Sequence, residues 1–243
     1  MILKITPVFN EASLLPFHLR YYDWVTTQIF FDFGSTDNSN DIIKKYAKQT
    51  KKDIRVIKCH TEEYREDLLM LIRNHYYKQF QEYNWIVIAD VDEFVYAPNL
   101  TDTLKKSNVD VFLCSGYNMF SENQMIDSDK CIVKQSKLGV QTDFHTKMSI
   151  FKPDVDIRYS WGCHKAYPEV KGRDIVINKK DFYLLHYRFF TLDIFRLSNK
   201  MKHRRNKIFS HTTKCGHHYD VEDHIIDQKY LKEQKDLKEL KFL

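Results

Sequence analysis

The first ninety residues alternate four times between a short β-rich run and a stretch with helical spacing. The runs are Ile2 to Thr6, Gln28 to Asp32, Ile54 to Cys59 and Trp85 to Ala89. Repeated strand–helix units favour a mostly parallel sheet flanked by helices, with right-handed crossovers. Ligands of such sheets bind at the carboxyl ends of the strands. The alternation therefore predicts an α/β fold and the edge of the sheet where a site would lie.

Three helices are expected between these runs. The first spans Ser13 to Tyr22, the second follows the turn Gly34 to Ser39, and the third covers about Glu62 to Gln81. Short polar side chains in the turn can accept hydrogen bonds from the free amide groups of the second helix. The third helix carries apolar residues at helical spacing, which are Leu68, Leu69, Ile72, Tyr76 and Phe80.

The strand–helix rhythm weakens beyond Leu100. A short helix is expected near Thr101 to Ser107, and Asn118 to Thr142 is polar enough to predict a long loop of the kind that forms lids. Thr191 is expected to cap a basic helix. Further strands are expected at Asp110 to Ser115, Lys147 to Lys152 and Phe182 to Tyr187.

Composition narrows the class of protein. With 6 glycines among 243 residues, the chain lacks both GxGxxG and GxxxxGK[ST], so a bound phosphate would need a metal or basic side chains. The net charge of +5 suits an anionic substrate or a membrane surface and does not require nucleic acid. Five scattered cysteines, no signal-like N-terminus and no long apolar run predict a cytoplasmic location.

Carboxylates gather where the fourth β-rich run ends, in the stretch Asp90-Val-Asp92-Glu93-Phe94. Side chains alternate along a strand, so Asp90 and Asp92 are expected on one face, about 6.6 Å apart. Such a group is costly unless a positive charge arrives, and a divalent cation carrying a phosphate ester would supply it. An acidic loop that merely follows a strand is the alternative. Asn10, Glu11 and Asp32 also fall at strand ends.

Five stretches, taken in order, resemble family 2 glycosyltransferases of the GT-A fold, and are closest to the branch with an Asp-x-Asp-Glu-Phe motif. The resemblance is good over residues 1 to 96 and patchy to about residue 205. In the second stretch Phe33 replaces an aspartate of the family pattern. The five are Thr6 to Glu11, Phe31 to Asp37, Arg73-Asn74, Asp90 to Phe94 and His186 to Arg188.

The resemblance implies an inverting hexosyltransferase that moves a sugar from a nucleotide-sugar donor to a glycan or lipid-linked acceptor in polysaccharide biosynthesis. It implies one domain, with a nucleotide-sugar half at 1–96, an acceptor-side half at 97–210 and a basic helical tail at 211–243. Mn²⁺ or Mg²⁺ would be held by Asp90, Asp92 and His186. The donor would be bound by Pro7, Asn10, Glu11, Asp32, Arg73, Asp90 and Arg188.

The catalytic base is expected in the second half, because inversion needs a group that takes the proton of the acceptor hydroxyl. The family often places an acidic Glu-Asp pair in the second half, but no such pair follows the Trp161-Gly162 turn, where His164 stands instead. His164 is therefore the first candidate, with Asp143 and Glu169 as alternatives.

Other functions stay open. Phe33 and the missing acidic base fit a catalytically inactive sugar-nucleotide-binding protein, and a nucleotidyltransferase can share the strand order and the acid pair. The basic residues after Thr191 and in the tail form either solvated faces or a peripheral contact with anionic lipid at the inner face of a membrane. A metal-binding module would use His211, Cys215, His217, His218 and His224.

Overall fold

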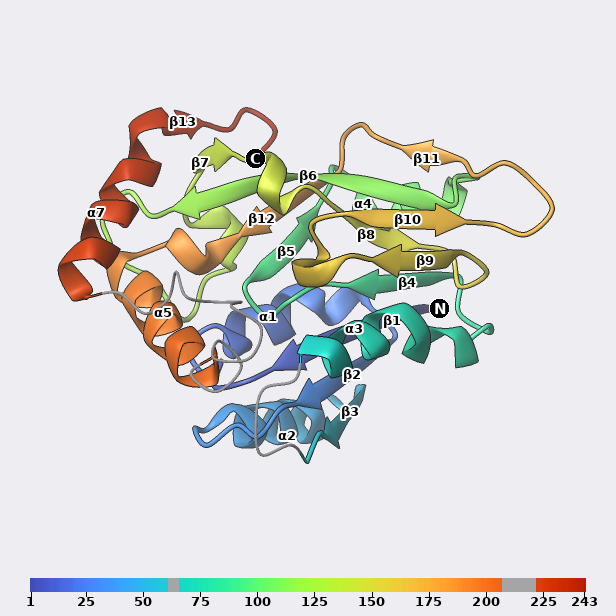
Figure 1. The fold of residues 1–243 in the computed structure, drawn as a ribbon, viewed down its shortest axis with the longest axis horizontal. Helices are drawn as coiled ribbons and strands as arrows, with labels where there is room; N and C mark the ends of the chain where they lie inside the picture. The colour runs from blue at the N-terminus through green and yellow to red at the C-terminus, as the bar shows by residue number, and fades with distance from the viewer. Residues whose placement is uncertain (61–65, 207–221) are drawn as a thin grey trace.

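The computed structural model of this protein describes residues 1–60, 66–206 and 222–243, with the backbone alone for residues 202–206. Its first half contains the predicted alternation (Figure 1). The elements are β1 (Ile2–Val8), α1 (Leu15–Tyr21), β2 (Thr27–Asp32), α2 (Ser39–Thr50), β3 (Asp53–Lys58), α3 (Glu66–His75) and β4 (Trp85–Ile88). The pairs β3–β2, β2–β1 and β1–β4 are all parallel. The predicted α/β class is confirmed, and the expected helix start at Glu62 lies outside the described residues.

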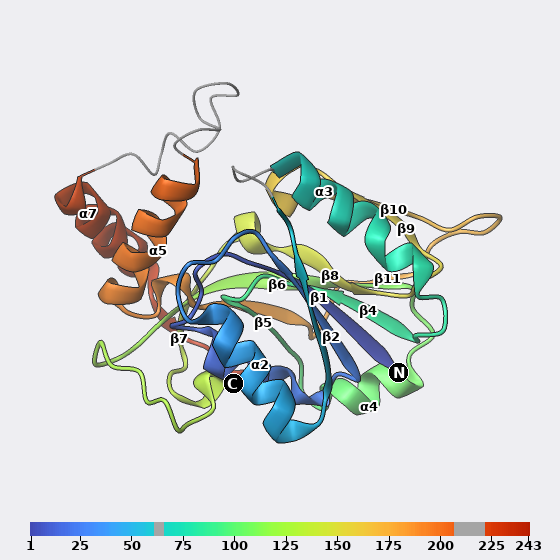
Figure 2. The ribbon, with the colours of Figure 1, turned by 90° about the horizontal axis from the view of Figure 1, so that it is seen from below.

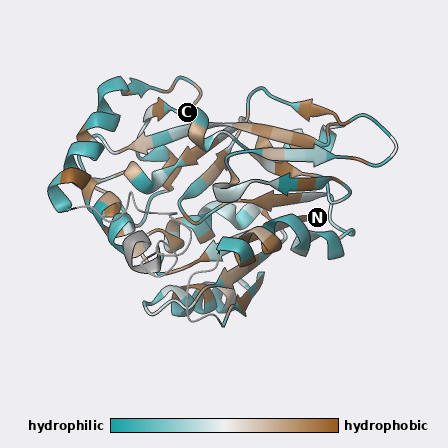
Figure 3. Cartoon of the chain, viewed as in Figure 1, coloured by the Kyte–Doolittle hydropathy of each residue, from teal (hydrophilic) through white to brown (hydrophobic). Residues whose placement is uncertain are grey.

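Alternating side chains on the parallel strands build a core on each face of the sheet. Leu3 and Ile5 of β1 pack in one cluster with Ile72 of α3. Phe30 of β2 packs in another cluster with Ile43 of α2. Figure 2 shows α3 and α2 on opposite sides of the sheet, and Figure 3 shows the central strands as largely hydrophobic between more polar helices. This two-sided burial explains why the strands read as apolar runs.

The second half extends the sheet from β4 with antiparallel strands. β8 (Lys147–Phe151) lies between β4 and β6 (Val111–Phe120), and β7 (Leu138–Gln141) pairs with the end of β6. The prediction of one long loop over Asn118–Thr142 is therefore wrong at both ends. Asn118 and Ser121 are buried polar residues whose side chains form hydrogen bonds, and their polarity masked the strand. The remaining α-helices and strands before residue 190 are β5 (Glu93–Tyr96), α4 (Leu100–Lys106), β9 (Asp156–Tyr159), β10 (Ala166–Glu169), β11 (Ile177–Asn178) and β12 (Tyr183–His186).

Strand β12 connects the two halves near the acidic stretch. It pairs in parallel with β6 and antiparallel with β5. In this register His186 lies beside Glu93 on one side and Asn118 on the other. Because β5 begins directly after the acidic turn, the pairing of β12 with β5 places His186 next to Asp92.

The C-terminal elements cover the far end of β6. They are α5 (Leu192–Asn206), α7 (Asp223–Glu233) and β13 (Lys238–Glu239), which pairs with β7. Phe195 of α5 and Tyr230 of α7 pack against Phe120 of β6, and the two helices lie side by side in Figures 1 and 2. The Thr191 hydroxyl accepts a hydrogen bond from the Ile194 amide at 3.2 Å, as the predicted cap requires. No helix of the described chain is long and apolar enough to cross a membrane.

Asp110 is a buried carboxylate outside the site, and its hydrogen bonds allow the packing at the start of β6 to be tested. Asp110, just before β6, accepts hydrogen bonds from Arg173 at 2.6 and 2.8 Å and from the Val176 amide at 2.9 Å. Hydrogen bonding to Arg173 lowers the pKa of Asp110 to about 2 from the ordinary 3.8. We expect Asp110→Asn to lower the free energy of unfolding at neutral pH by about 1.5–3 kcal/mol, because a charge-assisted pair is lost.

The pH dependence of this difference has a defined sign. The folded pKa lies below the unfolded one, so the stabilisation is present above pH 3.8 and disappears as the pH falls toward 2. Urea unfolding of wild type and Asp110→Asn at several pH values measures it, with Asp102→Asn on the exposed side of α4 as the control. A difference in unfolding free energy between wild type and Asp110→Asn that stays constant from neutral pH down to about pH 2 would contradict this role for Asp110.

Candidate functional site

A pocket opens between α5 and the carboxyl ends of β1 and β4. Its hollow, together with the open solvent at its mouth, occupies about 430 Å³. Four residues predicted from sequence line it, namely Asn10, Glu11, Asp92 and Arg188. They come from segments far apart in the chain, so the fold assembles the site. The rest of the lining is Phe9, Ser13, Leu14, Ile194, Leu197, Ser198 and Met201.

The acidic residues lie in a tight turn between β4 and β5. The Glu93 amide donates to the Asp90 carbonyl at 3.1 Å, and the Asp90 amide donates to the Glu93 carboxylate at 3.0 Å. Because β4 ends at Ile88, strand alternation no longer applies to residues 90–92. The expectation that Asp90 and Asp92 share a strand face is therefore wrong, and their carboxylates meet different partners.

Asp92 lies beside His186. The Asp92 Oδ2 and His186 Nε2 atoms are 3.2 Å apart, and both side chains are largely buried. The Tyr187 amide donates to the Asp92 carbonyl at 2.8 Å and fixes the backbone. His186 Nδ1 lies 3.0 Å from the Asn118 side-chain oxygen, and the His145 ring stacks on the imidazole at 3.8 Å between centroids. Two groups that can ligate a cation are thus held side by side at the pocket.

The other two carboxylates of the turn pair with buried cations. Arg73 of α3 forms an ion pair with Asp90 and also donates to the Cys163 sulfur at 2.9 Å. Glu93 forms an ion pair with Lys147 of β8. Burial disfavours a charged lysine, yet the carboxylates of Glu93 and Asp90 outweigh it and raise the pKa of Lys147. These pairs neutralise the interior of the turn.

A polar pair beneath the turn escaped sequence reasoning. Lys4 of β1 is fully buried, and its ammonium group donates to Thr6, to His18 Nε2 at 2.8 Å and to the Ala89 carbonyl at 3.4 Å. His18 Nδ1 in turn lies 2.9 Å from the Val91 carbonyl. Burial lowers the pKa of Lys4. The sequence signal for this buried pair is the position of Lys4 between Leu3 and Ile5, two apolar core residues of β1.

Asn10 and Asp32 mainly hold the loops around the pocket. The Asn10 side-chain oxygen accepts from the Thr36 and Asp37 amides at 2.7 and 3.1 Å. The buried Asp32 carboxylate accepts from the Ser35 amide at 2.9 Å and from the Asn40 side chain at 2.7 Å. Asp32 thus lies within its own turn, outside the pocket lining, whereas Asn10 both lines the pocket and supports it.

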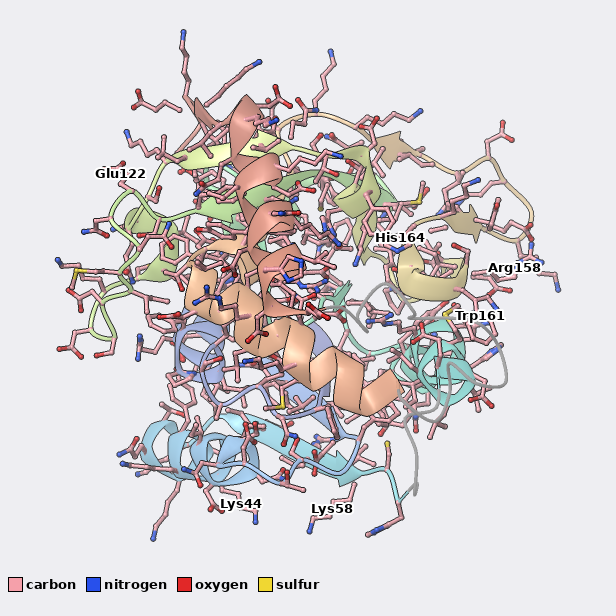
Figure 4. The ribbon with its side chains drawn as sticks, turned by 60° about the vertical axis from the view of Figure 1, so that its left-hand side comes forward. Lys44, Lys58, Glu122, Arg158, Trp161 and His164 are labelled. Carbon is pink, nitrogen blue, oxygen red and sulfur yellow. The ribbon has the colours of Figure 1, made fainter. Side chains whose placement is uncertain are left out.

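His164 directly follows a short 3₁₀ turn, Trp161–Cys163, that faces α3 (Figure 4). The half-buried ring places Nδ1 2.8 Å from the Phe144 carbonyl, so Nδ1 donates and Nε2 carries the lone pair. Burial lowers the pKa of His164, and the cationic Lys147 and Arg73 add to this effect. A neutral imidazole with a free lone pair can accept a proton.

The remaining predicted residues lie in simpler surroundings. Asp143 is exposed on the 3₁₀ turn Asp143–His145, and exposed Glu169 forms an ion pair with Arg158. Pro7 lies within β1, paired with Phe31 of β2. In the tail, His224 lies 3.1 Å from Glu222, whereas His211, Cys215, His217 and His218 fall outside the described residues.

The donor set fits a divalent cation that is shared with a ligand. Within the described ranges, no three His, Cys, Asp or Glu side chains converge to hold a metal by themselves. Asp92 and His186 provide two donors, and Mg²⁺-type sites commonly use one or two carboxylates together with substrate phosphates. Asp90, the third predicted ligand, forms an ion pair with Arg73, and its role at the metal stays a prediction.

No protein-family model matches this sequence, and a search of curated proteins finds no match. Among solved structures, a mannosyltransferase from Pyrobaculum calidifontis with GDP-Man and Mn²⁺ is 18% identical over 46% of this chain and 34% of its own, with a TM-score of 0.34. Glucosyl-3-phosphoglycerate synthase from Mycobacterium tuberculosis with Mn²⁺ and UDP is 14% identical over 51% and 45%, at 0.31.

A putative glucose-1-phosphate thymidylyltransferase from Bacillus anthracis is 10% identical over 96% of this chain and 83% of its own, with a TM-score of 0.35. This chain thus covers less than half the length of the two glycosyltransferases.

The contact between Gly162 and His164 offers a test of the histidine environment. A Cβ on Gly162, which has φ +69°, would lie 2.7 Å from His164 Nε2. We expect the ring of wild-type His164 to titrate below its unfolded value, and Gly162→Ala to displace the ring and raise that midpoint. NMR titration of the histidine ring protons measures both.

Gly172→Ala is the matched control, because Gly172 also has a positive φ, of +82°, but no atom within 4 Å of its Cβ position. It carries the same backbone strain without touching His164. A wild-type midpoint at or above the unfolded value, or equal effects of the two alanines, would contradict the assigned environment.

Proposed function

We propose that this protein is a metal-dependent, inverting glycosyltransferase that uses a nucleotide-sugar donor. The observation that carries the proposal is the convergence of Asn10, Glu11, Asp92 and Arg188 on one pocket, with His186 beside Asp92. Carboxyl ends of parallel strands are where nucleotides bind in sheets of this kind. The order of the five family-like stretches supports the same function.

Donor binding follows from the charges around the pocket. Arg188 is largely buried, donates to the Asn199 side chain at 2.8 Å and lies over the Phe195 ring. This support presents the guanidinium to the pocket, where it would bind a diphosphate. Asp92 and His186 would hold Mn²⁺ or Mg²⁺, which would stabilise the charge growing on the diphosphate leaving group. Glu11 would face the nucleoside.

The acceptor step requires a base, and His164 is our choice. The acceptor hydroxyl oxygen would attack the anomeric carbon as the bond from that carbon to the diphosphate oxygen breaks. The hydroxyl proton would pass to His164 Nε2, whose lowered pKa keeps the imidazole neutral and ready to accept it. Displacement from the opposite side inverts the anomeric configuration. We propose a saccharide or lipid-linked sugar as acceptor, consistent with assembly of a polysaccharide.

Peripheral membrane contact in the cytoplasm remains part of the proposal, although some basic groups of α5 have internal partners. Arg196 forms a two-pronged pair with Asp227 of α7, and Lys200 pairs with Asp223. Flotation with anionic vesicles at low salt tests this contact, and absence of binding would dismiss it.

The transferase proposal is tested by calorimetry with several nucleoside diphosphates and by a donor-hydrolysis screen, each with Mn²⁺. Diphosphate binding without turnover of any donor would favour the inactive sugar-nucleotide-binding protein. Release of pyrophosphate from a nucleoside triphosphate and a sugar phosphate would favour the nucleotidyltransferase. The absence of both nucleoside diphosphate binding and donor turnover would overturn the proposal.

Asp92→Ala provides a sharper prediction. We expect it to remove Mn²⁺-dependent nucleotide binding, because one of two adjacent donors is lost, while the thermal midpoint stays within a few degrees of wild type. Differential scanning fluorimetry and calorimetry measure the two effects. Asp102→Ala on the exposed side of α4 is the control for loss of one carboxylate. An unfolded Asp92→Ala variant would make Asp92 a structural residue.

A further inference from the structure

A chain of hydrogen bonds connects the C-terminal helix to the candidate metal ligand. Glu233, the last residue of α7, accepts from the Asn118 side-chain nitrogen at 3.3 Å. The Asn118 oxygen lies 3.0 Å from His186 Nδ1, and His186 Nε2 lies 3.2 Å from Asp92. Asn118, His186 and Asp92 are each at most 8% exposed. The chain thus passes from the end of α7 through the sheet to the pocket.

The donors and acceptors in this chain have only one consistent order. A carboxylate accepts and cannot donate, so the Asn118 amide nitrogen must face Glu233. The Asn118 oxygen therefore faces His186, and Nδ1 of His186 must carry a hydrogen. Nε2 then faces Asp92, whose carboxylate also only accepts, so Nε2 donates to it while no cation lies between them. The His145 ring, stacked on the imidazole, limits rotation of His186 out of this plane.

We propose that Asn118 and Glu233 are positioning residues that hold His186 with its hydrogen on Nδ1 and its Nε2 toward the cation position beside Asp92. Hydrogen-bond partners of a ligating histidine orient the ring and set its tautomer in metal sites generally. The role in metal binding rests on the proposed function. It gives the C-terminal segment a part in the site, in addition to its packing against β6.

Substitutions can separate this role from simple packing. Asn118→Leu keeps the size of the side chain and removes both hydrogen bonds. Asn118→Asp still accepts from His186 but places a carboxylate against Glu233. Adding Glu233→Gln to Asn118→Asp supplies a donor to the new carboxylate and restores the match. Tyr230→Phe is the matched control, because it removes another bond between α7 and the body, to Gln124 at 2.9 Å, with no link to His186.

The first readout needs neither metal nor donor. Ring nitrogen chemical shifts of His186, from NMR of protein labelled with ¹⁵N-histidine, report which nitrogen is protonated. We expect a protonated Nδ1 in wild type and in Tyr230→Phe, and a loss of this preference in Asn118→Leu. An unprotonated Nδ1 in wild type, or an unchanged preference in Asn118→Leu, overturns the assignment.

The second readout is Mn²⁺ affinity in the presence of a nucleoside diphosphate, measured by calorimetry. We expect Asn118→Leu and Asn118→Asp to weaken it about 10–100-fold, and the added Glu233→Gln to recover most of the loss. Equal losses in Tyr230→Phe, or no recovery in the double variant, would overturn the positioning role. A wild type that binds neither Mn²⁺ nor diphosphate contradicts the transferase proposal, whereas the tautomer measurement decides the assignment of the hydrogen bonds separately.

Discussion

The structure depends on charge compensation around one buried turn. Three carboxylates follow each other closely after β4, where leaving a buried charge uncompensated costs several kcal/mol, about 3–5 in measured cases. Each lies beside a side chain from a distant element, and for Asp90 and Glu93 that side chain is a buried cation. The three pairs are Asp90 with Arg73, Glu93 with Lys147, and Asp92 with His186.

These pairs differ in the type of group that faces each carboxylate. Arg73 and Lys147 bring full positive charges into the interior and serve the turn itself. His186 instead presents an imidazole to Asp92 at the pocket, where both atoms suit a cation that arrives with a phosphate ligand. The turn thus pairs two of its carboxylates with buried cations, while the largely buried Asp92–His186 pair lies beside the pocket that Asp92 lines.

Sequence reasoning located much of this site because strand ends are local features. Asn10, Glu11 and Asp92 follow strands whose periodicity is plain, and parallel pairing brings such ends together. It failed where a partner is decided by packing. Lys147 reads as the first residue of an ordinary strand, although it pairs with Glu93. The donor role of Asp32 stays a prediction, and its oxygens accept hydrogen bonds within its own turn. Asn118 was placed in a loop because its polarity hid the strand.

The sequence by itself determined the α/β class, the succession of the first four strands along the chain, and the edge of the sheet that carries the polar residues. Those properties follow from short-range periodicity and from the handedness of crossovers. Only the tertiary structure decided that Asp90 and Asp92 face different partners, since β4 ends before the turn. It also decided that β12 lies between β5 and β6, because strand pairing over long chain separations depends on burial that no local pattern encodes.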